Sequence, residues 1–179
     1  MQSTKLSAGA IFPTITLPTI SGSEVTLSTP QGEGNDWRLV VVYRGKHCPL
    51  CTRYLNALND LVPDFNQLGV DVVAVSADTL EKADAHLSEL KLNFEVAYGL
   101  SVEQMKALGL YISEPRSAAE TDSLFAEPGL FIINGEGKVQ IASTSNSPAV
   151  RPELAVIAQG LAFVRDPENN YPIRGTYEG

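Results

Sequence analysis

The chain has 179 residues, of which 44% are hydrophobic and 19% are charged, a balance typical of one globular domain with a filled core. Its net charge of −8 argues against a nucleic-acid backbone or an anionic membrane as the main partner. No stretch approaches ~20 consecutive apolar residues, and residues 1–20 lack a basic segment followed by an unbroken apolar one, so neither a membrane span nor a secretory signal is expected.

The first part of the chain predicts a hairpin and then a buried strand. Residues 16–17 and 24–27 flank a Ser-Gly-Ser turn, which indicates a short β-hairpin. Residues 31–36 contain two glycines and no apolar residue, as expected of a loop. The unbroken, valine-rich run at residues 39–43 is typical of a central strand that is buried on both faces.

A long amphipathic helix is predicted from Pro49, because apolar residues recur at every third or fourth position from there. Pro63 lies inside this pattern and should kink the helix or end its regular hydrogen bonding. Residues 70–75 predict a second buried strand. Acidic and hydroxyl side chains at residues 78–81 then open another helix. The apolar stripe expected on that helix consists of Leu80, Ala83, Leu87 and Leu90.

The next part of the chain predicts shorter elements. Residues 94–97 indicate a short extended piece, and residues 101–104 have the capping-box spacing that opens a short helix to Leu108. Residues 113–127 show no clear period, so a long connection is expected there. Such connections in compact domains are usually functional or mobile.

A second hairpin and a last helix complete the pattern. Residues 130–133 and 139–142 predict strands joined by the turn Asn-Gly-Glu-Gly-Lys, and a helix begins at Pro152. The early strand–helix–strand order implies a parallel central pair, and the late hairpin adds antiparallel strands, with helices over both apolar faces. We therefore expect a single domain over residues 1–165, followed by an irregular tail at residues 166–179.

Cys48 and Cys51 are the only two cysteines, and they lie at the start of the first predicted helix. A thiol at a helix N-terminus meets unpaired amide groups and the positive end of the helix dipole, which favours the thiolate. Arg44 and His47 place a positive and a titratable group nearby, whereas Lys46 is expected to be solvated. Two thiols one turn apart can close and reopen a disulfide, so Cys48 is predicted to attack and Cys51 to resolve.

Two other interpretations of the cysteines lead to no redox chemistry. The thiols could be inert and buried, or they could form half of a zinc site with His47 and His86. Structural zinc usually needs four Cys or His ligands. Here His47 adjoins Cys48, which makes a shared tetrahedron awkward, and His86 is expected on the surface of a different helix. No metal site is therefore expected.

Three parts of the chain carry a resemblance to a known family. The first is the N-terminal set Leu6, Gly9, Pro13, Leu17, Gly22, Val25 and Leu27. The second is the pair of segments Tyr43-Arg44-Gly45 and His47-Cys48-Pro49-Leu50-Cys51, and the third is Gly129-Leu130-Phe131-Ile132-Ile133. Over about residues 6–164 the chain resembles the alkyl hydroperoxide reductase/thiol-specific antioxidant (AhpC/TSA) family: the first part resembles its N-terminal signature, the second its peroxiredoxin-like branch, and the third the strand after its active-site loop.

The resemblance implies a thioredoxin-like α/β fold, with a central mixed β-sheet flanked by helices and an N-terminal β-hairpin extension. It also implies a thiol-disulfide oxidoreductase, an antioxidant redoxin that needs no cofactor. Such a protein takes electrons from an external thiol or dithiol reductant and passes them to a disulfide or a peroxide. Family members often self-associate, so a homodimer is compatible with the resemblance. A reducing cytoplasm suits a lone pair of neighbouring cysteines best.

The chain departs from the family at the peroxide-reducing motif. A typical peroxiredoxin carries Pro-x-x-x-Thr/Ser-x-x-Cys. If Cys51 is the last residue of the motif, Arg44 stands at the proline and Cys48 at the hydroxyl residue. If Cys48 is the last residue, Val41 and Gly45 stand in those places.

A second departure is Pro128, which stands where the peroxide-binding arginine of peroxiredoxins would precede Gly129. Thioredoxin-type redoxins carry a cis-proline there, packed against the dithiol, so a cis Glu127–Pro128 bond is expected. Together the departures favour disulfide exchange through Cys48 and Cys51. The alternatives are a true peroxidase that reduces hydrogen peroxide or alkyl hydroperoxides, and a redox-inert thioredoxin-fold binding module.

Overall fold

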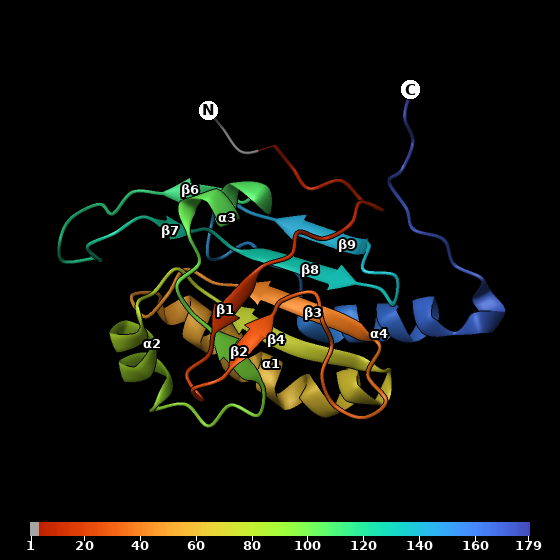
Figure 1. Ribbon diagram of the computed structural model, residues 1–179, viewed down its shortest axis with the longest axis horizontal. Coiled ribbons are helices and arrows are strands. Elements are labelled where there is room, and N and C mark those ends of the chain that lie inside the picture. Colours follow the sequence, from red (N-terminus) through yellow and green to blue (C-terminus); the bar gives the residue numbers. More distant parts are fainter. Residues whose placement is uncertain (1–3) are drawn as a thin grey trace.

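The computed structural model describes residues 4–179, which are built around a five-stranded sheet (Figure 1). The strand order is β5-β4-β3-β8-β9. The parallel pairs are β3·β4 and β4·β5, and the antiparallel pairs are β3·β8 and β8·β9, so the sheet is mixed as predicted. The bounds are β3 Trp37–Val42, β4 Val70–Val75, β5 Glu95–Ala97, β8 Gly129–Ile133 and β9 Val139–Thr144.

The two faces of the sheet are covered by different kinds of element (Figure 1). Alternate residues of β3 point to opposite faces, as the two-residue period of a strand requires: Leu39 and Val41 enter one core, and Val40 and Val42 enter the other. The first core is closed by α1 (Pro49–Gln67), α2 (Leu80–Leu87) and α4 (Leu154–Arg165). The second core is closed by α3 (Val102–Ala107) and the hairpin of β1 (Thr16–Pro18) and β2 (Glu24–Thr26). The predicted N-terminal hairpin is thus present, and it substitutes for a long helix on that face.

The long connection after α3 is organised at its two ends. β6 (Ile112–Ser113) pairs antiparallel with β7 (Phe125–Ala126), so the intervening residues form a loop that returns to the sheet immediately before β8. This two-stranded piece has no periodic pattern because it is too short to show one. After α4, residues 166–179 contain one 3₁₀ turn at Pro167–Asn169.

α1 continues past Pro63 to Gln67, so this proline does not end the helix, and Val62 and Phe65 hold its last turns in the core. Two local predictions about α2 were wrong. Leu80 is 50% exposed rather than part of the apolar stripe of α2. His86 is buried at 8% exposure instead of lying on the surface, because it faces α1 and not solvent.

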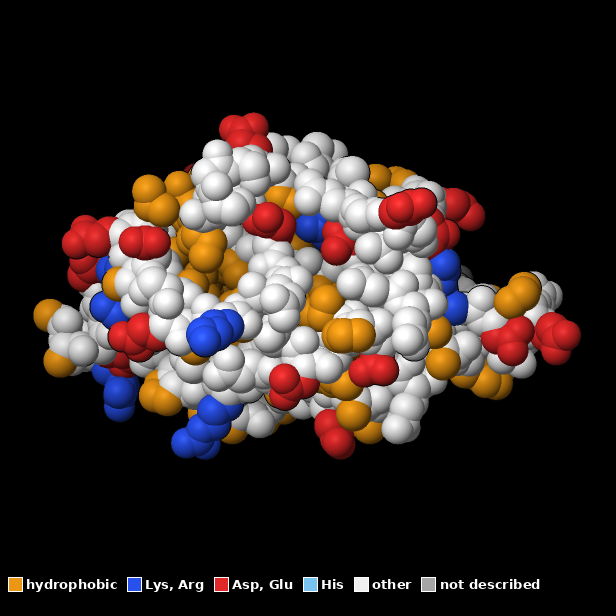
Figure 2. Space-filling model, turned by 90° about the horizontal axis from the view of Figure 1, so that it is seen from below, with side chains coloured by type: hydrophobic (Ala, Val, Ile, Leu, Met, Phe, Trp, Pro, Cys, Tyr) orange, Lys and Arg blue, Asp and Glu red, His pale blue; other side chains and the backbone are white. Residues whose placement is uncertain are grey.

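The surface carries both signs of charge. On the side seen from below in Figure 2, acidic and basic side chains are interspersed with apolar ones and do not gather into one large patch of a single sign. Within residues 4–179, no helix has both the length and the hydrophobicity needed to cross a membrane.

Candidate active site

The two cysteines lie where β3 gives way to α1. Cys48 is the N-cap of α1, with extended backbone angles of φ −115° and ψ 101°, and Pro49 occupies the first helical position, where a missing N–H costs nothing. The backbone N–H of Cys51 donates to the Sγ atom of Cys48 at 3.3 Å. Sulfur therefore takes the capping place usually held by a serine or aspartate oxygen. Both cysteines are free thiols, and they are buried at 2% and 0% exposure.

A hydrogen bond between the two thiols lowers the pKa of Cys48 and raises the pKa of Cys51. Because the thiol of Cys51 donates to Cys48, the pKa of Cys48 falls to about 6, although burial opposes the shift. The amide of Cys51 and the positive charge of Arg151 add to this lowering of the pKa of Cys48. The same hydrogen bond, together with burial, raises the pKa of Cys51. The opposite directions of the two pKa shifts make Cys48 the thiol of the pair that ionises first.

Only Cys48 of the pair reaches the surface hollow beside it. This open depression has a volume of about 390 Å³. It is lined by Arg44, His47, Cys48, Pro49, Leu50, Arg116, Glu120 and Pro148. Cys48 is therefore the cysteine that borders the depression, although it is only 2% exposed, and Cys51 is fully enclosed.

Arg44, which lines the depression together with Cys48, contacts two acidic side chains. Its Nε atom is 3.2 Å from Glu127 Oε2, and its Nη2 atom is 3.5 Å from Glu120 Oε1. Its guanidinium also lies 4.6 Å from the centre of the Phe125 ring. Hydrogen bonding to Arg44 contributes to the low pKa of Cys48. The long connection thus supplies groups that hold Arg44 in place at the sulfur.

His47 is next to Cys48 in sequence but is packed against an aromatic ring. The centres of the His47 and Phe125 rings are 4.5 Å apart, in an edge-to-face arrangement. Burial, and secondly the charge of Arg44, lowers the pKa of His47. The imidazole is therefore neutral at pH 7, and His47 acts as a packing residue of the depression more than as a charge beside Cys48.

The loop before the cysteines is held by a buried carboxylate. Asp78, which is 6% exposed, accepts a hydrogen bond from the backbone N–H of Lys46 at 2.8 Å. Gly45 has a φ of +137°, and a Cβ atom built there would lie 2.5 Å from Asp78 Oδ1. Glycine is required at this position both for its backbone angle and for the close approach of the carboxylate.

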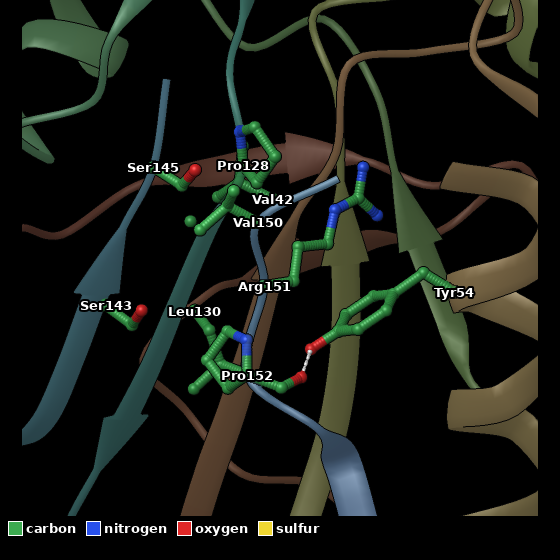
Figure 3. Close-up of a pocket in the computed structure, with 10 residues that line it drawn as sticks. Val42, Tyr54, Pro128, Leu130, Ser143, Ser145, Val150, Arg151 and Pro152 are labelled. Atoms are coloured by element: carbon green, nitrogen blue, oxygen red, sulfur yellow. Dashed lines mark hydrogen bonds between the residues drawn. The ribbon is translucent and has the colours of Figure 1, made fainter. Parts of the chain in front are cut away.

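The predicted cis bond before Pro128 is wrong. Every peptide bond in residues 4–179 is trans. Glu127 N donates to Tyr111 O at 2.8 Å, and Pro128 O accepts from Ser145 N at 3.1 Å. These bonds keep the chain extended from β7 into β8, whereas a cis bond would draw the neighbouring Cα atoms together. Pro128 lines a cavity of about 10 Å³, the space of one water molecule, beside Tyr54 and Arg151 (Figure 3).

Arg151 is a site residue that sequence analysis missed. It lies in the loop between β9 and α4, and its Nη2 atom donates to Cys51 Sγ at 2.7 Å. Its guanidinium lies 4.9 Å from the centre of the Tyr54 ring. The hydroxyl of Tyr54 in turn donates to Pro152 O at 2.6 Å (Figure 3). No motif surrounds Arg151, and 100 positions separate it from Cys51, so no local sequence signal could have identified it.

The two histidines of the zinc interpretation make separate contacts. His86 Nε2 is 2.7 Å from Thr52 Oγ1, and His47 packs on Phe125. Among residues 4–179, no three His, Cys, Asp or Glu side chains come together in a cluster that could hold a metal ion.

Comparison with known proteins identifies relatives over most of the chain. The sequence profile of the AhpC/TSA family matches residues 8–142. A putative peroxiredoxin of Mycobacterium tuberculosis (strain H37Rv) is 26% identical over 162 residues, which are 87% of this chain and 99% of the relative. The thiol-disulfide oxidoreductase ResA of Bacillus cereus is 25% identical over 136 residues, 75% of this chain and 68% of the relative. The crystal structure of a peroxiredoxin 6 from Arenicola marina superposes with a TM-score of 0.75 and 17% identity, covering 91% of this chain and 75% of the other. This likeness establishes the thioredoxin-like fold.

The acidity of Cys48 predicts how its alkylation depends on pH. The thiolate fraction should rise through pH ~6, so the rate at which iodoacetamide modifies Cys48 should be nearly constant above pH 7. Cys51→Ala removes the hydrogen-bond donor, so the midpoint should move toward the ordinary value of ~8.5. Mass spectrometry of the peptide that contains Cys48 measures both profiles. A wild-type midpoint near that ordinary value, or the same midpoint in the variant, would contradict the assignment.

The close approach of Asp78 predicts the effect of a methyl group at Gly45. Gly45→Ala should lower the free energy of unfolding more than Gly22→Ala does. Gly22 also has a positive φ, +89°, but has no atom within 4 Å of its Cβ position, so its variant should cost only about 1–2 kcal/mol of backbone strain. Urea unfolding of both variants measures the difference. An equal decrease in the free energy of unfolding of both variants would mean that Asp78 moves away from the added methyl group without loss of stability.

Proposed function

The chain belongs to the AhpC/TSA family, and from this premise we propose that it is a thiol-disulfide oxidoreductase whose redox centre is the pair Cys48 and Cys51. The observation that carries the proposal is the arrangement of the two sulfurs. Cys48 Sγ accepts the amide of Cys51 at the start of α1 and lines the open depression, while Cys51 is enclosed behind it. This arrangement favours a thiolate on Cys48 at the border of the depression and keeps the second thiol enclosed next to it.

The proposed reaction has two displacements at sulfur. The thiolate of Cys48 attacks one sulfur of a substrate disulfide, the substrate S–S bond breaks, and one substrate thiolate leaves. Cys51 then attacks Cys48 Sγ, which releases the second substrate thiol and leaves a Cys48–Cys51 disulfide. The protein has lost two electrons and the substrate has gained them. An external thiol or dithiol reductant restores the protein by the reverse chemistry.

Direct reduction of peroxide is the second candidate, and one contact favours it. In one register Cys51 holds the peroxide-reducing position of the family, and Arg151 donates to its sulfur at 2.7 Å. In this reaction the thiolate attacks the peroxide, becomes a sulfenic acid and releases water or an alcohol, and the other cysteine condenses with it to a disulfide and a second water. Against this candidate, Arg44 and Cys48 occupy the proline and hydroxyl positions of the motif, and Pro128 stands in place of the arginine. We therefore place disulfide exchange first.

The proposal also implies partners and a setting. The reductant is an external thiol or dithiol, since the two cysteines alone cannot regenerate themselves. A reducing compartment such as the cytoplasm would keep the pair in its attacking form. Assembly into a homodimer, as in many family members, is part of the same proposal.

The two candidate reactions predict different kinetics. With dithiothreitol as the donor, the protein should accelerate the reduction of insulin disulfides, and Cys48→Ser should reduce this rate on the order of 100-fold or more, because the nucleophile is lost. The reduced protein should consume hydrogen peroxide no faster than a free thiol does. Turbidity measures the first rate and a peroxide electrode the second.

Peroxide consumption well above that of a free thiol would instead establish the peroxidase. If the protein neither reduces insulin nor forms a disulfide under mild oxidation, it is a redox-inert thioredoxin-fold binding module. Cys51→Ser serves as the intermediate control, because it should stop at the mixed disulfide on Cys48.

A further inference from the structure

Arg151 bonds Cys51, which is not the attacking sulfur of the first displacement, and its charge only adds to a lowering of the pKa of Cys48 that comes first from the thiol of Cys51. In the reduced pair Cys51 is the protonated partner, and the hydrogen bond from a guanidinium to a neutral thiol is weak. The hydrogen bond to a thiolate is much stronger, since hydrogen bonds between ions are shorter and stronger than neutral ones. The bond from Arg151 Nη2 to Cys51 Sγ, 2.7 Å long, is therefore suited to a state in which Cys51 carries the charge.

The guanidinium is held for this contact by its own surroundings. Cys51 and Tyr54 lie one turn apart on α1 and face the same side, so the sulfur and the ring both contact Arg151. Figure 3 shows the side chain of Arg151 extended beside the Tyr54 ring, whose hydroxyl fixes Pro152. Nε and Nη1 of Arg151 are buried and find no hydrogen-bond partner among residues 4–179. The sulfur of Cys51 is thus the partner that Arg151 bonds within this site.

The first displacement changes which sulfur needs stabilisation. Once Cys48 Sγ is bonded to a substrate sulfur, it carries no negative charge and is a weak acceptor for the thiol of Cys51. The hydrogen bond that raises the pKa of Cys51 is then lost, whereas Arg151, which lowers this pKa, remains. Cys51 is 0% exposed, so bulk water cannot take over the stabilisation.

We propose that Arg151 is a catalytic residue of the second displacement, in which it stabilises the thiolate of Cys51 while that sulfur attacks Cys48. The inference rests on the dithiol exchange proposed above. The proton of Cys51 passes, directly or through water, to the departing substrate thiolate. The Cys51–Cys48 bond forms as the bond from Cys48 to the substrate sulfur breaks, and no other reactant is consumed.

The two displacements can be observed separately with 2,2′-dithiodipyridine at one molecule per protein. Attack by Cys48 releases the first thiopyridone, and closure by Cys51 releases the second. The probe has no net charge, so the loss of an arginine does not change its attraction to the site. In Arg151→Met the first release should keep its rate within about twofold, and the second should slow about tenfold or more, because the attacking thiolate is scarcer. The mixed disulfide should then accumulate in mass spectra.

Matched variants control for charge and for folding. Arg53→Met removes an exposed arginine from α1 and should change neither release. Arg151→Lys should recover part of the second rate, because it restores a cation without the guanidinium geometry. In a Cys48→Ser chain, Arg151→Met should raise the pH at which Cys51 is alkylated. The pH midpoint of Cys51 alkylation can be measured without disulfide exchange, and it would not change if Arg151 only supported the loop.

The remaining outcomes decide against the inference. Equal slowing of both releases would assign Arg151 to the attack by Cys48, and unchanged releases would leave it a structural residue. An unmoved Cys51 midpoint in the Cys48→Ser background would likewise overturn its role. If the wild-type protein releases only one thiopyridone, the dithiol function itself fails, which is a different result from a selective loss of the second release.

Discussion

The structure depends on one hydrogen-bonded junction, the sulfur of Cys48 at the first turn of α1. A thiolate there accepts the amide of Cys51 and faces the positive end of a helix of 19 residues. The helix can present its end in this way because β3 ends at Val42 and only the short loop of residues 43–48 connects it to α1. The buried carboxylate of Asp78 fixes that loop through the amide of Lys46.

Charges around the junction come from three distant parts of the chain. Arg44 follows β3, the carboxylates of Glu120 and Glu127 come from the long connection, and Arg151 precedes α4. The carboxylates contact Arg44, which lines the depression, and Arg151 contacts Cys51. The charge of Arg151 therefore lowers the pKa of both cysteines, which suits a reaction in which negative charge moves from one sulfur to the other.

The protein combines the fold of the AhpC/TSA family with site residues that resemble those of thioredoxin-type redoxins. The fold and the sequence profile are those of the AhpC/TSA family. The two thiols on one helical turn and the proline before β8 are the features that led us to propose disulfide exchange, although the bond before Pro128 is trans and not cis as expected. The hydrogen bonds of Glu127 and Pro128 to neighbouring backbone account for this difference, because they continue the extended chain from β7 into β8.

The sequence alone determined the elements whose signals are local. Hydrophobic period predicted β3, α1 and β4, capping residues predicted α3, and the sequence also placed Cys48 and Cys51 at the start of α1. Tertiary structure alone decided what depends on residues far apart in the chain. Examples are the burial of His86 against Thr52, the neutral packing of His47 on Phe125, and the bond from Arg151 to Cys51. A contact between two side chains that are far apart in the chain produces no periodic pattern in the sequence, because only the packing of the sheet and helices brings the two side chains together.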